Sequence, residues 1–218
     1  FTYTFCDDAA RDALVRAHFP KLYELYARLP MEVMKADVWR YVVIYMYGGV
    51  YADMDTVCVR RPDMFVQPAS WLVFVPENGA PYFCQWVFAA PPKSPLMAAV
   101  IEELTKRLVG AGRVTGASFA HDPHLIHGLT GPAMFTDAVR GFWGRRGLPS
   151  LPSVEAYARF PAHLMHVLPR TVHWKVVQHA SLGSTTADGW QAERDRMVVA
   201  GRGARGVEVR PGLIRRGV

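Results

Sequence analysis

Helical and strand-like stretches alternate in the hydrophobic pattern of this 218-residue chain. Apolar positions recur at helical spacing over 8–18 and 21–28, and aspartates before the first of these runs can cap its first turn. Over 32–47 the chain has no Gly or Pro and is apolar on nearly every face. That stretch predicts a buried helix, which ends at the Gly-Gly pair 48–49.

Short apolar runs bounded by Gly, Pro or Ser predict buried strands over 50–52, 71–75 and 85–90. The alternation of aromatic and polar residues over 1–5 is also typical of a strand, and 96–109 has the spacing of a surface helix. Helices interleaved with buried strands indicate the α/β class. The length suffices for one substantial core, so we expect a single domain.

Two charged residues stand inside the predicted buried helix. Asp37 and Arg40 are three positions apart and therefore lie on one helix face. Ionised groups are costly to bury unless a partner satisfies them. Two interpretations stay open from the helix alone: an intrahelical ion pair with a purely structural role, or part of a functional site.

A second pair of charges follows the predicted strand 50–52. Asp53 and Asp55 come at its carboxyl end, two residues apart, and are able to point the same way. Ligands of open α/β sheets bind at that end of the strands. Two carboxylates there can hold Mg²⁺ or Mn²⁺, which share their oxygen ligands with substrate phosphates. The structural alternative is a solvated acidic turn.

Composition narrows the choice of partners. The net charge is +6 and the pI is near 9.4, but Lys and Arg are scattered except in an Arg-rich end, 202–218, which we expect to form a hairpin or a frayed basic tail. No nucleic-acid-binding motif accompanies the charge, so we expect an anionic small molecule or surface and no nucleic acid. No run is long enough to cross a membrane. A cytoplasmic site is favoured, with the Golgi lumen as the alternative if an anchor has been removed.

Two strings carry a family resemblance: ADVWRY at 36–41 and YGGVYADMDT at 47–56. They resemble the sugar-binding region with the DXD motif of the Och1-like and capsular-polysaccharide glycosyltransferases, related to the catalytic domains of the large clostridial glucosylating toxins. The match is close over 5–62 and patchy beyond. It implies a single GT-A catalytic domain over 1–218, with a Rossmann-like mixed sheet flanked by helices.

The resemblance also implies an activity: retaining transfer of a hexose from a UDP- or GDP-linked sugar to a glycan or other hydroxyl acceptor, with Mn²⁺ or Mg²⁺ as cofactor. By motif position, Asp37 and Arg40 are the catalytic residues, and Asp53, Asp55 and His179 are the metal ligands. The residues implied in substrate binding are Asp37, Arg40, Tyr51, Ala52, Asp53, Thr130, Gly131, Pro132, Gly183 and Ser184.

Two departures from the family pattern leave other functions open. The strand that precedes 1–5 in relatives is missing, so either it lies outside the sequence or base recognition differs. The turn at 91–95 also lacks the family's Gly and His. One alternative is therefore a non-catalytic nucleotide-sugar or glycan-binding relative. The other is a haloacid-dehalogenase-type phosphohydrolase with Asp53 as nucleophile, although no downstream Lys and acidic pair complete that site.

Overall fold

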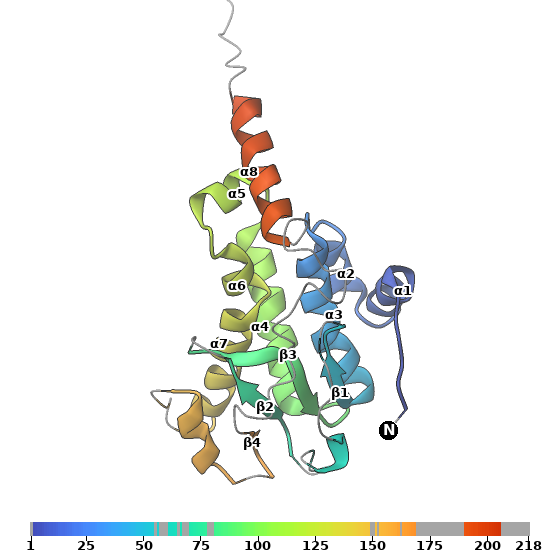
Figure 1. Ribbon diagram of the computed structural model, residues 1–218, viewed down its shortest axis with the longest axis vertical. Helices are drawn as coiled ribbons and strands as arrows, with labels where there is room; N and C mark the ends of the chain where they lie inside the picture. Colours follow the sequence, from blue (N-terminus) through green and yellow to red (C-terminus); the bar gives the residue numbers. More distant parts are fainter. Residues whose placement is uncertain are drawn as a thin grey trace, which may run out of the picture.

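A small mixed sheet flanked by helices forms the body of the protein, as a computed structural model shows (Figure 1). The structure describes residues 2–54, 56, 61–64, 66, 70–77, 81–148, 151, 153–161, 163–168 and 190–205. The helices are α1 (Asp8–His18), α2 (Pro20–Tyr26), α3 (Glu32–Tyr47), α4 (Pro95–Ala111), α5 (Gly116–His121), α6 (Leu125–Leu129), α7 (Pro132–Gly144) and α8 (Trp190–Arg205). Two 3-10 turns, η1 (Pro62–Met64) and η2 (Glu155–Arg159), complete the helical elements of this part of the chain.

The sheet has four described strands in the order β1-β3-β2-β4. They are β1 (Gly49–Ala52), β2 (Val73–Pro76), β3 (Phe83–Ala90) and β4 (His166–Val167). Strand β3 runs antiparallel to β1 and to β2, whereas β2 and β4 are parallel. The predicted α/β class with a mixed sheet is confirmed, and β1, which leads into the DXD motif, is an edge strand of the sheet.

The predicted central helix is confirmed from Glu32 to Tyr47. Gly48 ends it with φ 67°, and its N–H donates to the carbonyl of Ile44 at 2.8 Å. A Cβ at Gly48 would lie 2.5 Å from Cδ of Pro92, so no side chain fits there. The tight turn therefore fixes the end of α3 and the start of β1 against the loop after β3.

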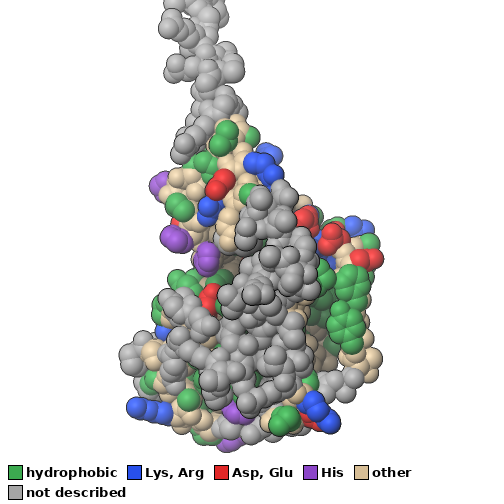
Figure 2. Space-filling model, viewed as in Figure 1, with side chains coloured by type: hydrophobic (Ala, Val, Ile, Leu, Met, Phe, Trp, Pro, Cys, Tyr) green, Lys and Arg blue, Asp and Glu red, His purple; other side chains and the backbone are tan. Residues whose placement is uncertain are grey.

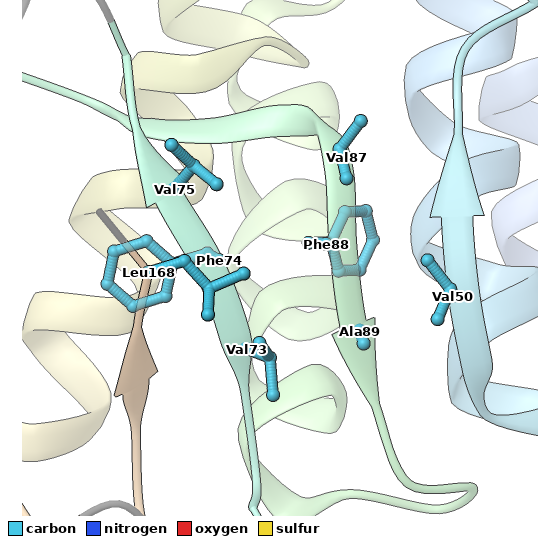
Figure 3. A pocket seen from close by; sticks show the side chains of 8 residues that line it. All are labelled: Val50, Val73, Phe74, Val75, Val87, Phe88, Ala89 and Leu168. Carbon is cyan, nitrogen blue, oxygen red and sulfur yellow. The ribbon is translucent and has the colours of Figure 1, made fainter. Parts of the chain in front are cut away.

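The two faces of the sheet carry different apolar sets. Phe74 and Phe88 face the helices, whereas Val73, Val75 and Ala89 form a separate apolar cluster on the opposite face (Figure 3). The register between β2 and β3 shifts after Phe74. Phe74 pairs with Phe88 but Pro76 pairs with Phe83, so β3 has extra residues between these two pairs. Such a bulge changes which residues of a strand face inward.

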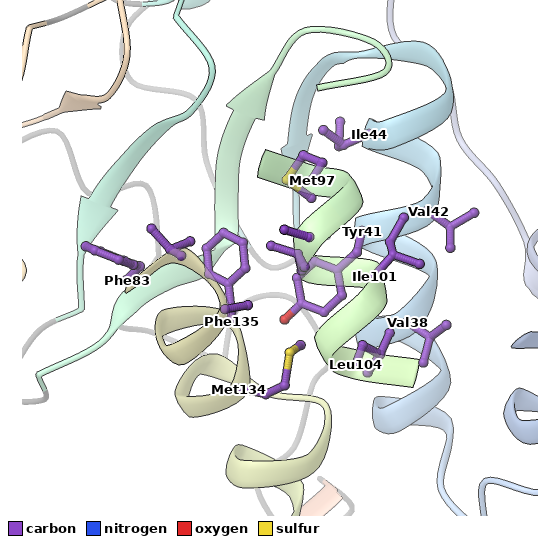
Figure 4. Packing of buried hydrophobic residues seen from close by; sticks show 14 of the residues in the cluster. Val38, Tyr41, Val42, Ile44, Phe83, Met97, Ile101, Leu104, Met134 and Phe135 are labelled. Carbon is purple, nitrogen blue, oxygen red and sulfur yellow. The ribbon is translucent and has the colours of Figure 1, made fainter. Parts of the chain in front are cut away.

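The main core lies between the sheet and three helices. Tyr41 on α3, Phe83 on β3 and Phe135 on α7 are fully buried in it, and Met97 and Ile101 of α4 pack nearby (Figure 4). Helix α4 contacts both α3 and α7, while α3 and α7 contact the sheet. This packing places α3 against β1, the strand that ends one residue before Asp53.

Three details differ from the expectations for the ends of the chain and the second helix. Residues 2–7 form no strand, because no described strand pairs with them. The second helix starts at Pro20 and ends at Tyr26, slightly earlier than expected. The hairpin or frayed tail expected from Arg202 is wrong for 202–205, which belong to α8.

Helix α8 packs on α5, above the rest of the body in the ribbon view of Figure 1 and in the space-filling view of Figure 2 from the same side. Its backbone comes so close that a Cβ at Gly116 would lie 2.1 Å from the carbonyl oxygen of Met197. The local hydrophobic pattern of the sequence does not predict this contact between distant segments. Among the helices of the described ranges, none is long and apolar enough to cross a lipid bilayer.

Candidate active site

Helix α3 presents both of its buried charges to the sheet. Asp37 is 1% exposed and Arg40 is 5% exposed, and Oδ1 of Asp37 lies 3.2 Å from Nη2 of Arg40. The predicted ion pair is therefore formed. It sits where the helix faces the carboxyl end of β1, beside Asp53. A functional role for the pair stays a prediction.

Asp37 is held by donors from three other positions. The Nε2 amide of Gln85 on β3 donates to its Oδ1 at 3.1 Å, and the hydroxyl of Thr130 donates to its Oδ2 at 2.7 Å. Burial raises the pKa of Asp37 to about 6, although Arg40, Thr130 and Gln85 all favour the carboxylate form. At neutral pH the group is thus mainly ionised, at a cost to stability.

Arg40 links the buried carboxylate to the strand end. Its Nη2 also lies 3.3 Å from Oδ1 of Asp53, and its Nη1 donates to the backbone carbonyl of Gln85 at 3.3 Å. The guanidinium lies 5.1 Å from the ring centre of Tyr51. Burial opposes its charge, but Tyr51, Asp53 and Asp37 together raise its pKa, so Arg40 is a permanent cation.

Arg40 has one donor to spare. Its Nε is buried and has no hydrogen-bond partner in the described part of the structure, and neither has the indole N–H of Trp39. Trp39 and Arg40 both contact the ring of Tyr51, Trp39 with an edge contact of 5.9 Å between ring centres. A buried donor without a partner is costly, and both of these donors lie beside the ring of Tyr51.

Strand β1 brings Tyr51 and Asp53 to the same place. The hydroxyl of Tyr51 donates to Oδ1 of Asp53 at 2.7 Å, and burial raises the pKa of Tyr51, so it stays a neutral donor. The backbone N–H of Asp53 bonds the carbonyl of Trp86 on β3, which fixes its position. Among the described residues both side-chain partners of Asp53 contact Oδ1, so Oδ2 remains available to a cation.

The structure brings together Asp37, Arg40, Tyr51, Asp53 and Thr130 from separate elements. Of the remaining predicted residues, Ala52 is exposed at the end of β1, Gly131 caps α7 and Pro132 opens it. A Cβ at Gly131 would lie 2.9 Å from Cα of His127, which explains the glycine. The predicted contacts of Thr130, Gly131 and Pro132 with substrate stay predictions, and the Thr130 hydroxyl is already donated to Asp37.

Four predicted residues lie outside the described residues: Asp55, His179, Gly183 and Ser184. Within the described ranges no group of three or more His, Cys, Asp or Glu side chains could hold a metal. Asp53 is the one predicted metal ligand whose position the structure gives, and its free Oδ2 at a strand end suits a hard divalent cation. The complete ligand set stays a prediction.

The sequence analysis did not predict two buried residues of the site, Tyr41 and Gln85. The hydroxyl of Tyr41 has two acceptors within reach, Oε1 of Gln85 and, at 3.0 Å, the backbone carbonyl of Thr130. A signal for Gln85 was available, because it is the only amide side chain in an otherwise apolar strand. Tyr41 ends the string ADVWRY, but its residue type gave no sign of a polar contact, since an aromatic residue is ordinary on a buried helix face.

The chain is similar in sequence to known glycosyltransferases. Residues 7–71, which include Asp37, Arg40 and Asp53, match the model of the glycosyltransferase sugar-binding region containing the DXD motif. The chain is 24% identical over 164 residues to an initiation-specific alpha-1,6-mannosyltransferase of Schizosaccharomyces pombe, an alignment that covers 65% of this chain and 41% of that protein.

Two further relatives come from the same yeast. Inositol phosphoceramide mannosyltransferase 3 is 29% identical over 158 residues, which is 72% of this chain and 39% of that protein. Inositol phosphoceramide mannosyltransferase 1 is 36% identical over 77 residues, which is 35% of this chain and 24% of that protein. The chain thus spans well under half of each relative.

These matches confirm the resemblance to Och1-like glycosyltransferases with a DXD sugar-binding region. The relation to the clostridial toxins stays a prediction.

Proposed function

We propose that this protein is a metal-dependent retaining glycosyltransferase that moves a hexose from a nucleotide-diphosphate sugar to a glycan or other hydroxyl acceptor. The observation that carries the proposal is the line of charges Asp37–Arg40–Asp53, which runs from the core to the end of β1. The unpartnered donors of Arg40 and Trp39 lie beside it. Mannose is the first sugar to test, because the relatives are named mannosyltransferases.

Arg40 would contact the sugar or the diphosphate through its free Nε and stabilise negative charge on the leaving group as the glycosidic bond breaks. Asp37 keeps Arg40 in place. A carboxylate offers about four lone-pair positions, and three donors contact Asp37, so one position on Oδ2 is left for a sugar hydroxyl. Tyr51 would lie against the nucleotide and fix Asp53.

Asp53 and Asp55, with His179 as the predicted third ligand, would hold the divalent cation, which supplies Lewis-acid neutralisation of the diphosphate leaving group when it is bound. The described site has no carboxylate placed as a free nucleophile, because both oxygens of Asp37 accept from protein donors and Asp53 is paired with Arg40. We therefore favour a front-face displacement in which the leaving phosphate deprotonates the acceptor. Trapping of a covalent glycosyl-enzyme would overturn that mechanism.

The test is a thermal-shift and hydrolysis screen of UDP- and GDP-linked sugars, mannose included, with and without Mn²⁺ or Mg²⁺. Wild type is compared with Asp55→Ala and with Asp63→Ala. Asp63 is a matched control because it is a half-exposed acid in η1 whose ion pair among the described residues is local, with Arg61. We expect metal-dependent release of one nucleoside diphosphate, lost in the first variant and retained in the second. If no nucleotide sugar binds with metal present, the transferase proposal fails.

A further inference from the structure

A buried hydrogen-bond path leads away from Asp37 into the core. Gln85 donates its Nε2 to Asp37, and its Oε1 contacts the hydroxyl of Tyr41. All three side chains are buried, Asp37 and Tyr41 almost completely. The proposed function assigns no task to Tyr41 or Gln85, although both are polar and both lie behind its central carboxylate.

The chemistry of the path gives it a direction. An amide side chain has a donor end and an acceptor end, and a half-turn exchanges them. An ionised Asp37 only accepts, so Gln85 must point its NH₂ at Asp37 and its Oε1 at Tyr41. The hydroxyl of Tyr41 has one proton, and of its two described acceptors this Oε1 is the closer, so Tyr41 is the side-chain donor that meets it. On the side of Gln85 away from Asp37, the Tyr41 hydroxyl is thus the described side-chain contact that favours one orientation of the amide.

The ring of Tyr41 is itself held in place. It stacks on Phe135 of α7, with 5.4 Å between ring centres and 13° between ring planes, and lies 6.3 Å from the ring of Phe88. In Figure 4 its hydroxyl points into the space between α3 and α7. The hydroxyl also lies 3.0 Å from the carbonyl of Thr130, the residue that holds the other oxygen of Asp37.

We propose that Tyr41 and Gln85 are positioning residues, which fix the orientation of the Asp37 carboxylate and through it Arg40 in the proposed transferase site. This inference rests on the proposed function. Neither residue touches substrate. Tyr41 sets the orientation of the Gln85 amide, the amide holds Oδ1 of Asp37, and the same oxygen pairs with Arg40. Gln85 adds a second hold, because its backbone carbonyl accepts from Arg40.

The first test is a double-mutant cycle on kcat/KM with the donor found in the screen. Tyr41→Phe keeps the stacked ring and removes one hydroxyl, and Gln85→Leu removes the amide. We expect kcat/KM to fall about tenfold in each single variant, since each interrupts the same hydrogen-bond path from Tyr41 through Gln85 to Asp37. The double variant should also lose about tenfold instead of 100-fold, and Tyr41→Phe should have no further effect in an Asp37→Asn background.

Tyr26→Phe is the matched control. Tyr26 is equally buried and its hydroxyl also bonds a charged cluster, at Arg11 and Asp12 on α1. This variant should lower the melting temperature and change kcat/KM less than twofold. If the losses of Tyr41→Phe and Gln85→Leu multiply, or if Tyr26→Phe loses as much activity as Tyr41→Phe, the positioning role is overturned and general destabilisation explains the effects.

A second readout does not depend on turnover. The chain has four glutamines and one asparagine, so its side-chain amide NMR spectrum is sparse, and Gln85→Leu assigns the signal of Gln85. One of its amide protons should be strongly deshielded and slow to exchange in wild type, and should lose both properties in Tyr41→Phe.

An unchanged Gln85 signal overturns the inference whatever the activity. If wild type shows the expected signal but transfers no sugar, the proposed function fails while the fixed orientation of Asp37 stands. The two failures are thereby distinguished.

Discussion

Two clusters in this protein each combine an arginine, two carboxylates and a tyrosine, and they differ in how deeply the carboxylates are buried. Arg11 on α1 pairs with Asp8 and Glu32 and bonds the hydroxyl of Tyr26. Arg40 on α3 pairs with two carboxylates and lies against Tyr51. The side chains of Asp8 and Glu32 are 82% and 57% exposed, whereas that of Asp37 is 1% exposed.

The difference in burial reverses the direction in which the pKa of the acid shifts. Burial opposes ionisation of Glu32, but hydrogen bonds from Lys35 and Arg11 prevail and lower its pKa. At Asp37 burial prevails, and the pKa rises to about 6. The Arg11 cluster thus ties α1 to α2 and α3 at little cost. The Arg40 cluster costs stability, which is typical of a site maintained for function.

The largest contrast is expected from removing each arginine. Arg40→Met leaves Asp37 buried without its cation and should lower the free energy of unfolding by about 3–5 kcal/mol. Arg11→Met leaves carboxylates that water can reach and should cost about 1 kcal/mol. Urea denaturation of both variants measures the difference. Equal losses would show that burial is not what separates the two clusters.

The next contrast concerns activity. Asp37→Asn should lower kcat/KM for the donor by roughly 100- to 1,000-fold, because a neutral amide no longer holds Arg40 for the leaving group. The variant should still fold, since the Thr130 hydroxyl can accept from the new amide. Asp12→Asn, beside Arg11, is the control and should change kcat/KM less than twofold.

A third contrast appears in the pH dependence of stability. The raised pKa of Asp37 means that the folded protein binds this proton more tightly than the unfolded chain. The corresponding stability is present below about pH 4 and is lost as pH rises through about 6. The unfolding free energy of wild type should therefore fall relative to Asp37→Asn by about 3 kcal/mol over that window.

Glu32→Gln should behave in the opposite sense. The lowered pKa of Glu32 gives stability that is present at neutral pH and lost on acidification. Wild type should thus lose its advantage over Glu32→Gln as pH falls. Chemical denaturation at several pH values measures both slopes, and slopes of the same sign would contradict the assignment.

The smallest contrast is between the two tyrosines that face the arginines. Tyr51→Phe frees Oδ1 of Asp53 from one donor and should lower kcat/KM about fivefold with little change in melting temperature. Tyr26→Phe should lower the melting temperature and leave kcat/KM nearly unchanged. Steady-state kinetics and thermal unfolding on the same two variants separate the outcomes.

Sequence reasoning was strong where a signal is local. The bounds of α3 follow from the absence of Gly and Pro over 32–47 and from Gly48. The pair Asp37 and Arg40 follows from helical spacing, and Asp53 from its place after a short apolar strand. The prediction that this strand is buried was wrong, because β1 lies at the end of the described sheet and none of its residues is buried. These features depend on neighbours within about one helical turn, which the sequence displays directly.

What sequence reasoning missed depends on contacts between distant segments. Gln85 reaches Asp37 across 48 positions and Thr130 reaches it across 93, and no local pattern reports such distances. The irregularity of β3 around Gln85 also depends on its pairing with β2. Helix α8 was missed because its packing partner is α5, far earlier in the chain.

The close approach of Gly48 to Pro92 has a consequence for how this sequence can vary. In a saturation library covering the turn, Gly48 should tolerate no replacement, because even a methyl group would overlap the proline ring. Gly49 also has a positive φ, 95°, but a Cβ there would meet nothing within 4 Å. Asn or Asp should therefore be recovered at 49, so two adjacent glycines with the same local role would have opposite mutational fates.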